Sequence, residues 1–302
     1  MISGTLTKRI LIFALAGLIL CIHSIVTGQE NEKFYYENDN YINYKTIGRG
    51  SKNILFIHGF GSSLNTWEEI ADQFEKSIYK LYMIDLKGFG SSACPKDSKY
   101  GIFDQKQIII QFIYEVVCDN FSLVGHSLGG GICLLLATDS LVSSKIEKLI
   151  LIDNEIYSLQ IPYFVSYLKK PVINNLMLCL LTDKAKARFS LRGTVFPENF
   201  NKQMVKRYKE NFKGHGKSYA LKKSAKLVFP EDYYNVMTPN DKIDVPTMLI
   251  WGKDDKLFPV EATETLNSQI INSKLEVVDQ CGHIPQEEKP VITFKIINDF
   301  LK

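Results

Sequence analysis

The chain has little net charge: 36 lysines and arginines stand against 33 acidic residues, a formal charge of +3 over 302 residues. So small an imbalance gives no electrostatic case for a nucleic-acid partner. The sequence also has no internal repeat, no coiled-coil heptad pattern and no low-complexity tract. With 45% apolar and 23% charged residues, it has the composition of a globular protein with one large domain, or a domain with an insertion.

Cysteine is sparse and irregularly placed. Five of the six cysteines lie beyond residue 28, and none of them forms a Cys-x-x-Cys pair or a spacing typical of zinc sites: Cys94, Cys118, Cys133, Cys179 and Cys281. If residues 1–28 are removed, as predicted below, five thiols remain; because five is an odd number, at least one of them then stays unpaired within the chain, and the pairing of the others stays open. We interpret these cysteines as scattered small core residues.

Long hydrophobic runs are absent except for one near the N-terminus. Residues 10–22 form an apolar run of 13 residues after Lys8 and Arg9, whereas a helix that crosses a bilayer needs about 20. The positive start, the short apolar run and the small residues Val26 and Gly28 fit a secretory signal peptide. We therefore predict a signal peptide at residues 1–28 and export (secreted or periplasmic). The alternative is an uncleaved anchor at residues 10–26, the only membrane contact that the sequence suggests.

Continuous apolar runs separated by helical stretches dominate residues 29–153 and 245–302. Such runs are typical of strands buried on both faces, and they lie at 53–57, 79–84, 121–124, 149–152, 247–251 and 275–278. A short strand pair at 34–36 and 41–47 precedes them, and helical patterns lie at 105–117, 260–270 and 290–301. Strands that alternate with helices imply an α/β fold with a mostly parallel central sheet flanked by helices.

One long interval, residues 154–244, contains no clear strand. Because a structureless loop of that length is improbable in a compact domain, we predict several short helices inserted as a cap. The core domain is then residues 29–153 together with 245–302. The lysines and arginines of the insertion, among them Lys169, Lys186 and Arg188, are interpreted as a solvated outer face, with a role in binding an anionic ligand as the second interpretation.

A serine between glycines is the strongest candidate for chemistry. The apolar residues 121–124 run into Gly125-His126-Ser127-Leu128-Gly129, and a helix-like apolar stretch follows. Small residues two positions before and after the serine suit a sharp strand-to-helix turn that exposes the hydroxyl. A Gly-x-Ser-x-Gly pattern also occurs by chance, so the assignment of Ser127 as a nucleophile depends on partners elsewhere in the chain.

A serine nucleophile needs a histidine base. Adjacent residues on a tight turn point apart, which argues against His126, and His215 lies inside the insertion, away from any predicted strand end. His58 is interpreted as structural. His283 follows the predicted strand 275–278, at the edge where α/β sheets place their sites, and it is the candidate base.

The base needs a carboxylate that orients it. Asp254 and Asp255 follow the strand at 247–251, one loop away from His283, and Asp153 at the preceding strand end is the fallback. Asp85 lies in a glycine-rich turn that its side chain is expected to hold together.

The oxyanion needs two backbone N–H groups aimed at one point. Leu128 N–H, at the start of the helix after the serine, is the first. Phe60 N–H is the second, because it lies in a glycine-rich loop after the strand at 53–57.

Residues 34–302 resemble the serine hydrolases of the α/β-hydrolase fold. Four motifs in chain order carry the resemblance: His58-Gly59-Phe60-Gly61, Asp85-x-x-Gly88-x-Gly90-x-Ser92, Gly125-His126-Ser127-Leu128-Gly129-Gly130, and Gly252-x-x-Asp255 together with Gly282-His283. The order Ser, Asp, His is the one this fold imposes. The resemblance selects Asp255 over Asp254, and it implies that the insertion is the family's helical cap, which covers the active site.

The expected function is the hydrolysis of carboxylic esters through an acyl-enzyme, as in an esterase or lipase. No metal or cofactor is expected, and the small-molecule substrate would carry an apolar portion. A serine at the nucleophile position argues against epoxide hydrolase and haloalkane dehalogenase chemistry. The same residues would also serve a lactone, thioester or carbon–carbon bond hydrolase or a cofactor-free perhydrolase, and the alternative of another class is a non-catalytic ligand-binding protein on the same scaffold.

Overall fold

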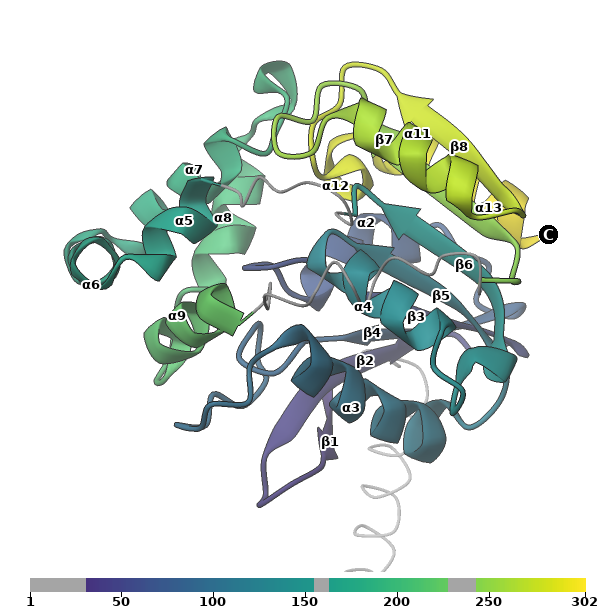
Figure 1. The fold of residues 1–302 in the computed structure, drawn as a ribbon, viewed down its shortest axis with the longest axis horizontal. Coiled ribbons are helices and arrows are strands. Elements are labelled where there is room, and N and C mark those ends of the chain that lie inside the picture. Colours follow the sequence, from purple (N-terminus) through teal and green to yellow (C-terminus); the bar gives the residue numbers. More distant parts are fainter. Residues whose placement is uncertain (1–30, 155–162, 228–242) are drawn as a thin grey trace, which may run out of the picture.

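The computed structural model describes residues 31–154, 163–227 and 243–302, and its centre is one eight-stranded sheet (Figure 1). The spatial order of the strands is β1-β2-β4-β3-β5-β6-β7-β8. Their bounds are β1 Asn31–Tyr35, β2 Tyr41–Ile47, β3 Lys52–Ile57, β4 Tyr79–Ile84, β5 Phe121–His126, β6 Ile146–Ile152, β7 Thr247–Gly252 and β8 Ser273–Val278. β2 is antiparallel to β1 and β4, and every other pair is parallel.

The strand order reverses direction at β3, which pairs with β4 on one side and with β5 on the other. The loops that follow β3 and β5 therefore leave the same edge of the sheet as neighbours. Open α/β sheets place their sites at such a reversal, outside the carboxyl ends of the strands.

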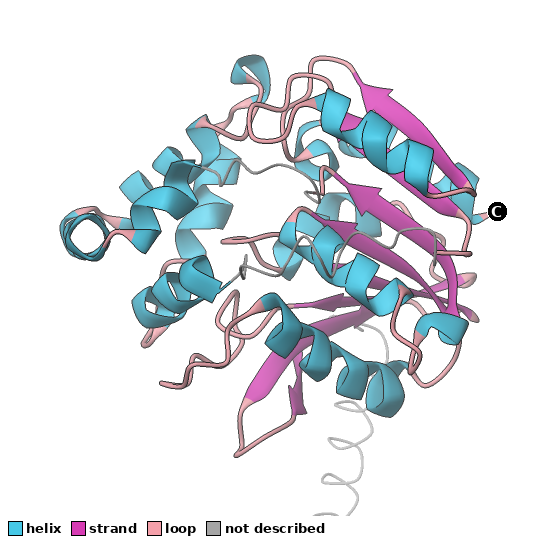
Figure 2. Cartoon of the chain, in the orientation of Figure 1, coloured by secondary structure: helices cyan, strands magenta, loops and turns pink. Residues whose placement is uncertain are grey.

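Helices cover both faces of the sheet. One face carries α3 (Ile102–Phe112), continued by the π-helical turn η2 (Ile113–Val117), together with α4 (Leu128–Ala137) and α11 (Val260–Gln269). The other carries η1 (Leu64–Trp67), α2 (Glu68–Ala71) and α13 (Pro290–Leu301), which α12 (Pro285–Glu288) precedes. The predicted fold class, a mostly parallel sheet between two layers of helices, is confirmed (Figure 2).

The central strands are apolar along their whole length because each side of the strand faces a different core. In β3, Leu55 and Ile57 pack into the cluster under α3 and α4, whereas Ile54 and Phe56 pack into the cluster under α13. This alternation is the period-two geometry of a strand. Fully burying each such side chain contributes about 1.5–3 kcal/mol relative to exposing it.

Helices fill the described part of the insertion between β6 and β7. They are α5 (Tyr163–Lys169), α6 (Pro171–Leu180), α7 (Asp183–Arg192), η4 (Pro197–Asn199), α8 (Lys202–Glu210) and α9 (Lys217–Leu227), and no strand occurs within residues 163–227. The group lies on the side toward which the arrowheads of β6 and β8 point (Figure 2). The predicted interval 154–244 extends over residues 155–162 and 228–242, which lie outside the described residues, so these boundaries stay a prediction.

The predicted signal peptide at residues 1–28 also lies outside the described residues, and export therefore stays a prediction. None of the helices in the described ranges is long and apolar enough to span a bilayer.

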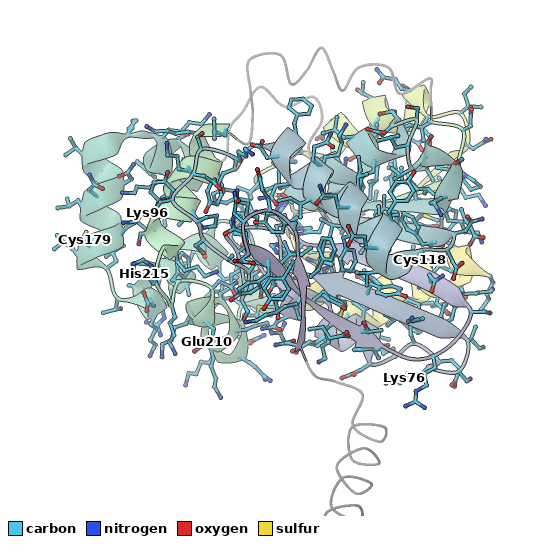
Figure 3. The ribbon with its side chains drawn as sticks, turned by 90° about the horizontal axis from the view of Figure 1, so that it is seen from below. Lys76, Lys96, Cys118, Cys179, Glu210 and His215 are labelled. Atoms are coloured by element: carbon cyan, nitrogen blue, oxygen red, sulfur yellow. The ribbon has the colours of Figure 1, made fainter. Side chains whose placement is uncertain are left out.

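All five cysteines beyond residue 28 are free thiols. Cys133 and Cys281 are buried, as expected for core residues, but the same interpretation is wrong for Cys118 and Cys179, which are exposed. Figure 3 shows these two at opposite ends of the molecule, too far apart to be partners for each other.

Candidate active site

Ser127 stands between β5 and α4 with φ 51° and ψ −119°, a conformation that a residue with a side chain rarely adopts. The turn is possible because the residues two positions before and after Ser127, Gly125 and Gly129, lack side chains. A Cβ atom on Gly129 would overlap the carbonyl oxygens of Ile57 and His58, and one on Gly125 would overlap the Cys133 sulfur. The expected strand-to-helix turn is thus present, and the backbone N–H of Ser127 is fixed by a 3.0 Å hydrogen bond to Ile152 O.

His283 and Asp255 meet at the same edge of the sheet. His283 lies on the loop after β8 and is buried, and its Nδ1 lies 2.8 Å from Asp255 Oδ2 on the loop after β7. The other carboxylate oxygen accepts hydrogen bonds from the backbone N–H groups of Leu257 (2.7 Å) and Phe258 (3.3 Å). Asp254, the other candidate acid, is half-buried. Its backbone N–H donates a hydrogen bond to Cys281 O on the loop after β8.

His126 connects the serine turn to the His283 loop, a role that sequence reasoning missed. Its Nε2 donates to the carbonyl oxygen of His283 at 2.7 Å, and the two imidazole rings lie 4.9 Å apart. Burial, helped by the charge of His283, holds the pKa of His126 well below its ordinary value, so the ring stays neutral. Its position beside Ser127 in the chain was the one available signal, but the partner is 157 residues away.

Asp153, the fallback acid, lies beside Asp255 at the end of β6 and is fully buried. Burial first, and then the negative charge of Asp255, raise the pKa of Asp153 well above its ordinary value. Its Oδ1 accepts a hydrogen bond from Gly252 N–H (3.0 Å), and Oδ2 has no donor. Because Asp255 accepts from three donors and Asp153 from one, we place the proton of this carboxyl pair on Asp153, which hydrogen-bonds to Asp255.

The ligand atoms of Asp153, Asp255 and His283 lie within 4.8 Å of one another, close enough for a metal ion. The hydrogen bonds just described already account for these atoms. A protonated carboxyl such as that of Asp153 is a poor metal ligand, because metal binding needs it to give up its proton, and the Nδ1 of His283 is already occupied by Asp255. The donor set therefore fits a hydrogen-bonded chain better than a metal centre.

The loop after β3 carries Phe60, next to the serine turn because β3 and β5 are paired. His58 in this loop is buried, its Nε2 accepts from Leu86 N–H (3.0 Å), and its Nδ1 donates to Gly59 O (2.7 Å). Burial lowers the pKa of His58, which keeps this ring neutral. The structural role expected of His58 agrees with these contacts.

The turn after β4 is held by Asp85, as expected, since its carboxylate accepts hydrogen bonds from Leu64 N–H, Ser91 N–H and the Asn43 amide. His215 is exposed on the surface of the cap (Figure 3).

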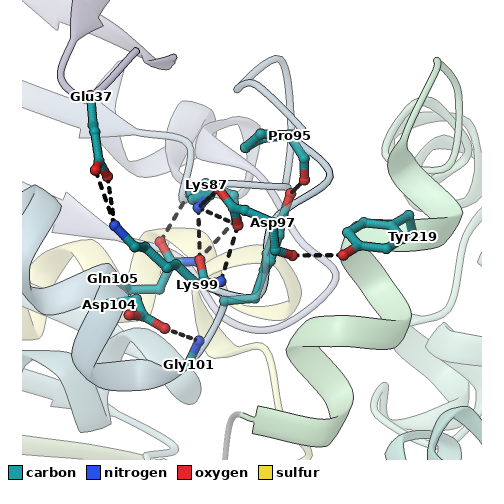
Figure 4. Close-up of polar contacts among 10 residues, drawn as sticks. Glu37, Lys87, Pro95, Asp97, Lys99, Gly101, Asp104, Gln105 and Tyr219 are labelled. Carbon is teal, nitrogen blue, oxygen red and sulfur yellow. Dashed lines mark hydrogen bonds and ion pairs between the residues drawn. The ribbon is translucent and has the colours of Figure 1, made fainter. Parts of the chain in front are cut away.

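The cap rests on the same loops. Asn211 Nδ2, just after α8, donates to Gly61 O at 3.1 Å, and Ala220 of α9 packs so closely on Gly88 that a Cβ there would lie 2.9 Å from it. Tyr219 OH of α9 donates to Asp97 O at 2.7 Å (Figure 4). These contacts fix the cap over the loops that follow β3 and β4.

Lys87, to which the sequence assigned no role, anchors the second of these loops. Its side chain is 2% exposed, and Nζ donates to both carboxylate oxygens of Asp97 and to Lys99 O at 2.8–2.9 Å (Figure 4). The ammonium also lies 4.7 Å from the centre of the Tyr100 ring. Buried and paired with these groups, Lys87 stabilises the loop.

A family model for the alpha/beta hydrolase fold matches residues 52–290, which include every loop described above. The chain belongs to this family. It is 26% identical to the uncharacterized hydrolase YugF of Bacillus subtilis over 285 residues, covering 89% of this chain and 94% of that protein. It is 25% identical to monoacylglycerol lipase ABHD6 of Rattus norvegicus over 297 residues, covering 89% and 81%.

The crystal structure of an alpha/beta hydrolase fold protein from Burkholderia ambifaria superimposes with a TM-score of 0.77 at 20% identity, covering 89% of this chain and 97% of that one. At this identity the likeness concerns the fold. Together with the sequence relatives, the family match makes this chain a hydrolase, as the sequence predicted.

Proposed function

We propose that this hydrolase cleaves carboxylic esters through an acyl-enzyme formed on Ser127. Ser127 Oγ attacks the ester carbonyl while His283 Nε2 accepts its proton. Asp255 keeps the proton on Nδ1, so that Nε2 is free to act as base, and it stabilises the imidazolium that forms. The oxyanion receives hydrogen bonds from the N–H groups of Phe60 and Leu128.

Collapse of the tetrahedral intermediate breaks the bond to the alcohol oxygen, which takes the proton from His283 as the alcohol leaves. Water then repeats the sequence. His283 removes a proton from water, the hydroxide attacks the acyl carbonyl, and the carboxylic acid leaves as Ser127 recovers its proton. One water molecule is consumed for each ester hydrolysed, and the proposed reaction uses no cofactor.

The observation that carries this proposal is the 2.8 Å contact of His283 Nδ1 with Asp255 Oδ2, on loops next to the strained turn of Ser127. His126 ties the two halves together by donating to the His283 carbonyl oxygen from the position next to the serine. The name of the rat relative, a monoacylglycerol lipase, supports an ester with an apolar acyl portion as the substrate class.

A fluorophosphonate probe tests the nucleophile. Wild-type protein is expected to become labelled and Ser127→Ala to stay unlabelled. Ser77→Ala is the matched control: Ser77 is an exposed serine between α2 and β4, and this variant is expected to label as the wild type does. Labelling of Ser127→Ala at the wild-type rate contradicts the proposal.

A panel of p-nitrophenyl esters of increasing acyl length then tests the substrate class. We expect the wild type to hydrolyse at least one member, and the rate to fall by about three orders of magnitude or more in Ser127→Ala. A labelled serine with no hydrolysis of any ester in the panel would turn the assignment toward another acyl substrate, such as a lactone or thioester.

A further inference from the structure

A narrow crevice separates the cap from the loops that follow β3 and β4. Gly61, Gly88 and Phe89 line it on the loop side, and the cap contributes Phe212, Lys217 and Leu221 among others. Its cavity volume of about 10 Å³ is close to what one water molecule needs. A substrate group that enters must therefore be small or must displace side chains of the cap.

Lys217, the first residue of α9, is the unusual group in this crevice. The residue is 9% exposed, and its Nζ is buried without a hydrogen-bond partner or an ion pair to the described part of the chain. Taking an ammonium out of water costs several kcal/mol unless a counter-charge or hydrogen-bond acceptors compensate it. Two other cations in the described part of the chain are compensated: the buried Lys87 pairs with Asp97, and the half-buried Arg207 pairs with Glu287.

The surroundings of Lys217 add to its positive potential. None of the described residues that line the crevice is acidic, and Lys186 lines it as a second cation, with Asp183 as its partner at 3.0 Å. The 11-residue helix α9 begins at Lys217, so the partial positive charge of a helix N-terminus falls at the same place. The crevice is therefore built to favour a negative charge.

The crevice also borders the loop after β3, which would supply an oxyanion donor in the proposed function. Phe89, in its wall, packs against the rings of His58 (5.8 Å between centres) and Phe60 (5.5 Å), and Gly61 directly follows Phe60 in the chain. The charge of Lys217 also contributes to the lowered pKa of His58. A group held at Lys217 therefore lies beside the loop that would supply an oxyanion donor.

We propose that Lys217 binds a negatively charged group, a carboxylate or a phosphate, of the ester that Ser127 cleaves. The proposal rests on the ester hydrolysis set out above and narrows its substrate class to anionic esters. The apolar side chains of Phe89, Phe212 and Leu221 in the same walls fit the hydrocarbon that connects the anionic group to the ester.

Two pairs of esters that differ only in charge test this. Mono-p-nitrophenyl glutarate carries a carboxylate where p-nitrophenyl valerate has a methyl group, and 1-butyrylglycerol 3-phosphate carries a phosphate that 1-butyrylglycerol lacks. For each pair the measured quantity is the ratio of kcat/KM, anionic over neutral, with the rate of Ser127→Ala subtracted as background. The proteins are the wild type, Lys217→Met, Lys217→Arg and, as control, Lys226→Met, which removes an exposed charge from the same helix.

We expect the wild-type ratio to exceed one in at least one pair, and that pair identifies the anion as carboxylate or phosphate. Lys217→Met is expected to lower this ratio at least about ten-fold, the equivalent of about 1.4 kcal/mol. Lys217→Arg keeps most of the ratio because it keeps the charge, and Lys226→Met keeps all of it.

Two results overturn the proposal while leaving ester hydrolysis intact: a wild-type preference for the neutral ester in both pairs, or an unchanged ratio in a Lys217→Met protein that still labels with fluorophosphonate. If Lys217→Met does not fold, the proposal is tested by the kcat/KM ratios, anionic over neutral, of the wild type and of Lys217→Arg. A wild type that labels at no serine and cleaves neither neutral ester refutes the proposed function itself, and the anion site falls with it.

Discussion

Replacing Asp153 by asparagine is expected to stabilise the protein at neutral pH, by an amount that grows as the pH rises. Asparagine keeps both hydrogen bonds of this buried position. Its Oδ1 accepts from Gly252 N–H, and its Nδ2 donates to Asp255, as the protonated carboxyl does in the wild type. What the substitution removes is the need to bind a proton on folding.

The magnitude follows from proton linkage. In the folded protein the pKa of Asp153 lies well above its ordinary value of 3.8, because the side chain is fully buried and Asp255 carries a negative charge beside it. Above about pH 4 the unfolded chain ionises this carboxyl while the folded chain keeps it protonated, so folding takes up one proton. The stability of the wild type therefore falls relative to Asp153→Asn by about 1.4 kcal/mol per pH unit, until the folded carboxyl itself ionises.

Urea unfolding of the two proteins between about pH 5 and pH 7 measures this difference, with the exposed carboxylate of Asp119 replaced in Asp119→Asn as a surface control. Ester hydrolysis by Asp153→Asn should stay near the wild-type rate, whereas Asp153→Ala, which loses both hydrogen bonds, should fall. A stability difference that does not change with pH would mean that Asp153 is ionised in the folded protein, and the assignment of the proton would be wrong.

Three further changes probe the turn, the connecting histidine and the cap. Gly129→Ala brings a methyl group into contact with backbone carbonyl oxygens at the end of β3. It should lower the free energy of unfolding, measured in urea, by about 1–3 kcal/mol, and it should abolish fluorophosphonate labelling. Wild-type behaviour in both assays would contradict the packing described for the turn. His126→Gln should keep the fall of kcat/KM at low pH, because burial lowers the pKa of His126 and keeps its ring neutral, so this ring is not the group that titrates. Loss of that fall in His126→Gln would make His126 the base. Arg207→Met leaves Glu287 buried without its 2.8 Å partner and should lower the free energy of unfolding by about 3–5 kcal/mol. The loss should be smaller at pH 5 than at pH 8, because burial already raises the pKa of Glu287 and its carboxyl can take up a proton at the lower pH. Equal losses of stability at both pH values would refute this explanation.

The amino-acid sequence by itself determined the α/β fold class and the places of the candidate site residues. Ser127, Asp255 and His283 each lie in the turn or loop that follows a strand, and parallel strands bring their carboxyl ends to one edge. The local sequence was therefore enough to predict these positions, because each residue is placed by the strand before it and the parallel sheet brings the strand ends together.

Only the tertiary structure decided the contacts between distant segments. From the residues alone Asp254 and Asp255 were equivalent. In the structure it is the carboxylate of Asp255 that contacts His283, while the backbone N–H groups of Leu257 and Phe258 hold its other oxygen. The same holds for the bond of His126 to the His283 carbonyl, for the proton on Asp153 and for the burial of Lys217. Burial and pairing depend on what other segments bring to a residue, and that information is absent from any short stretch of sequence.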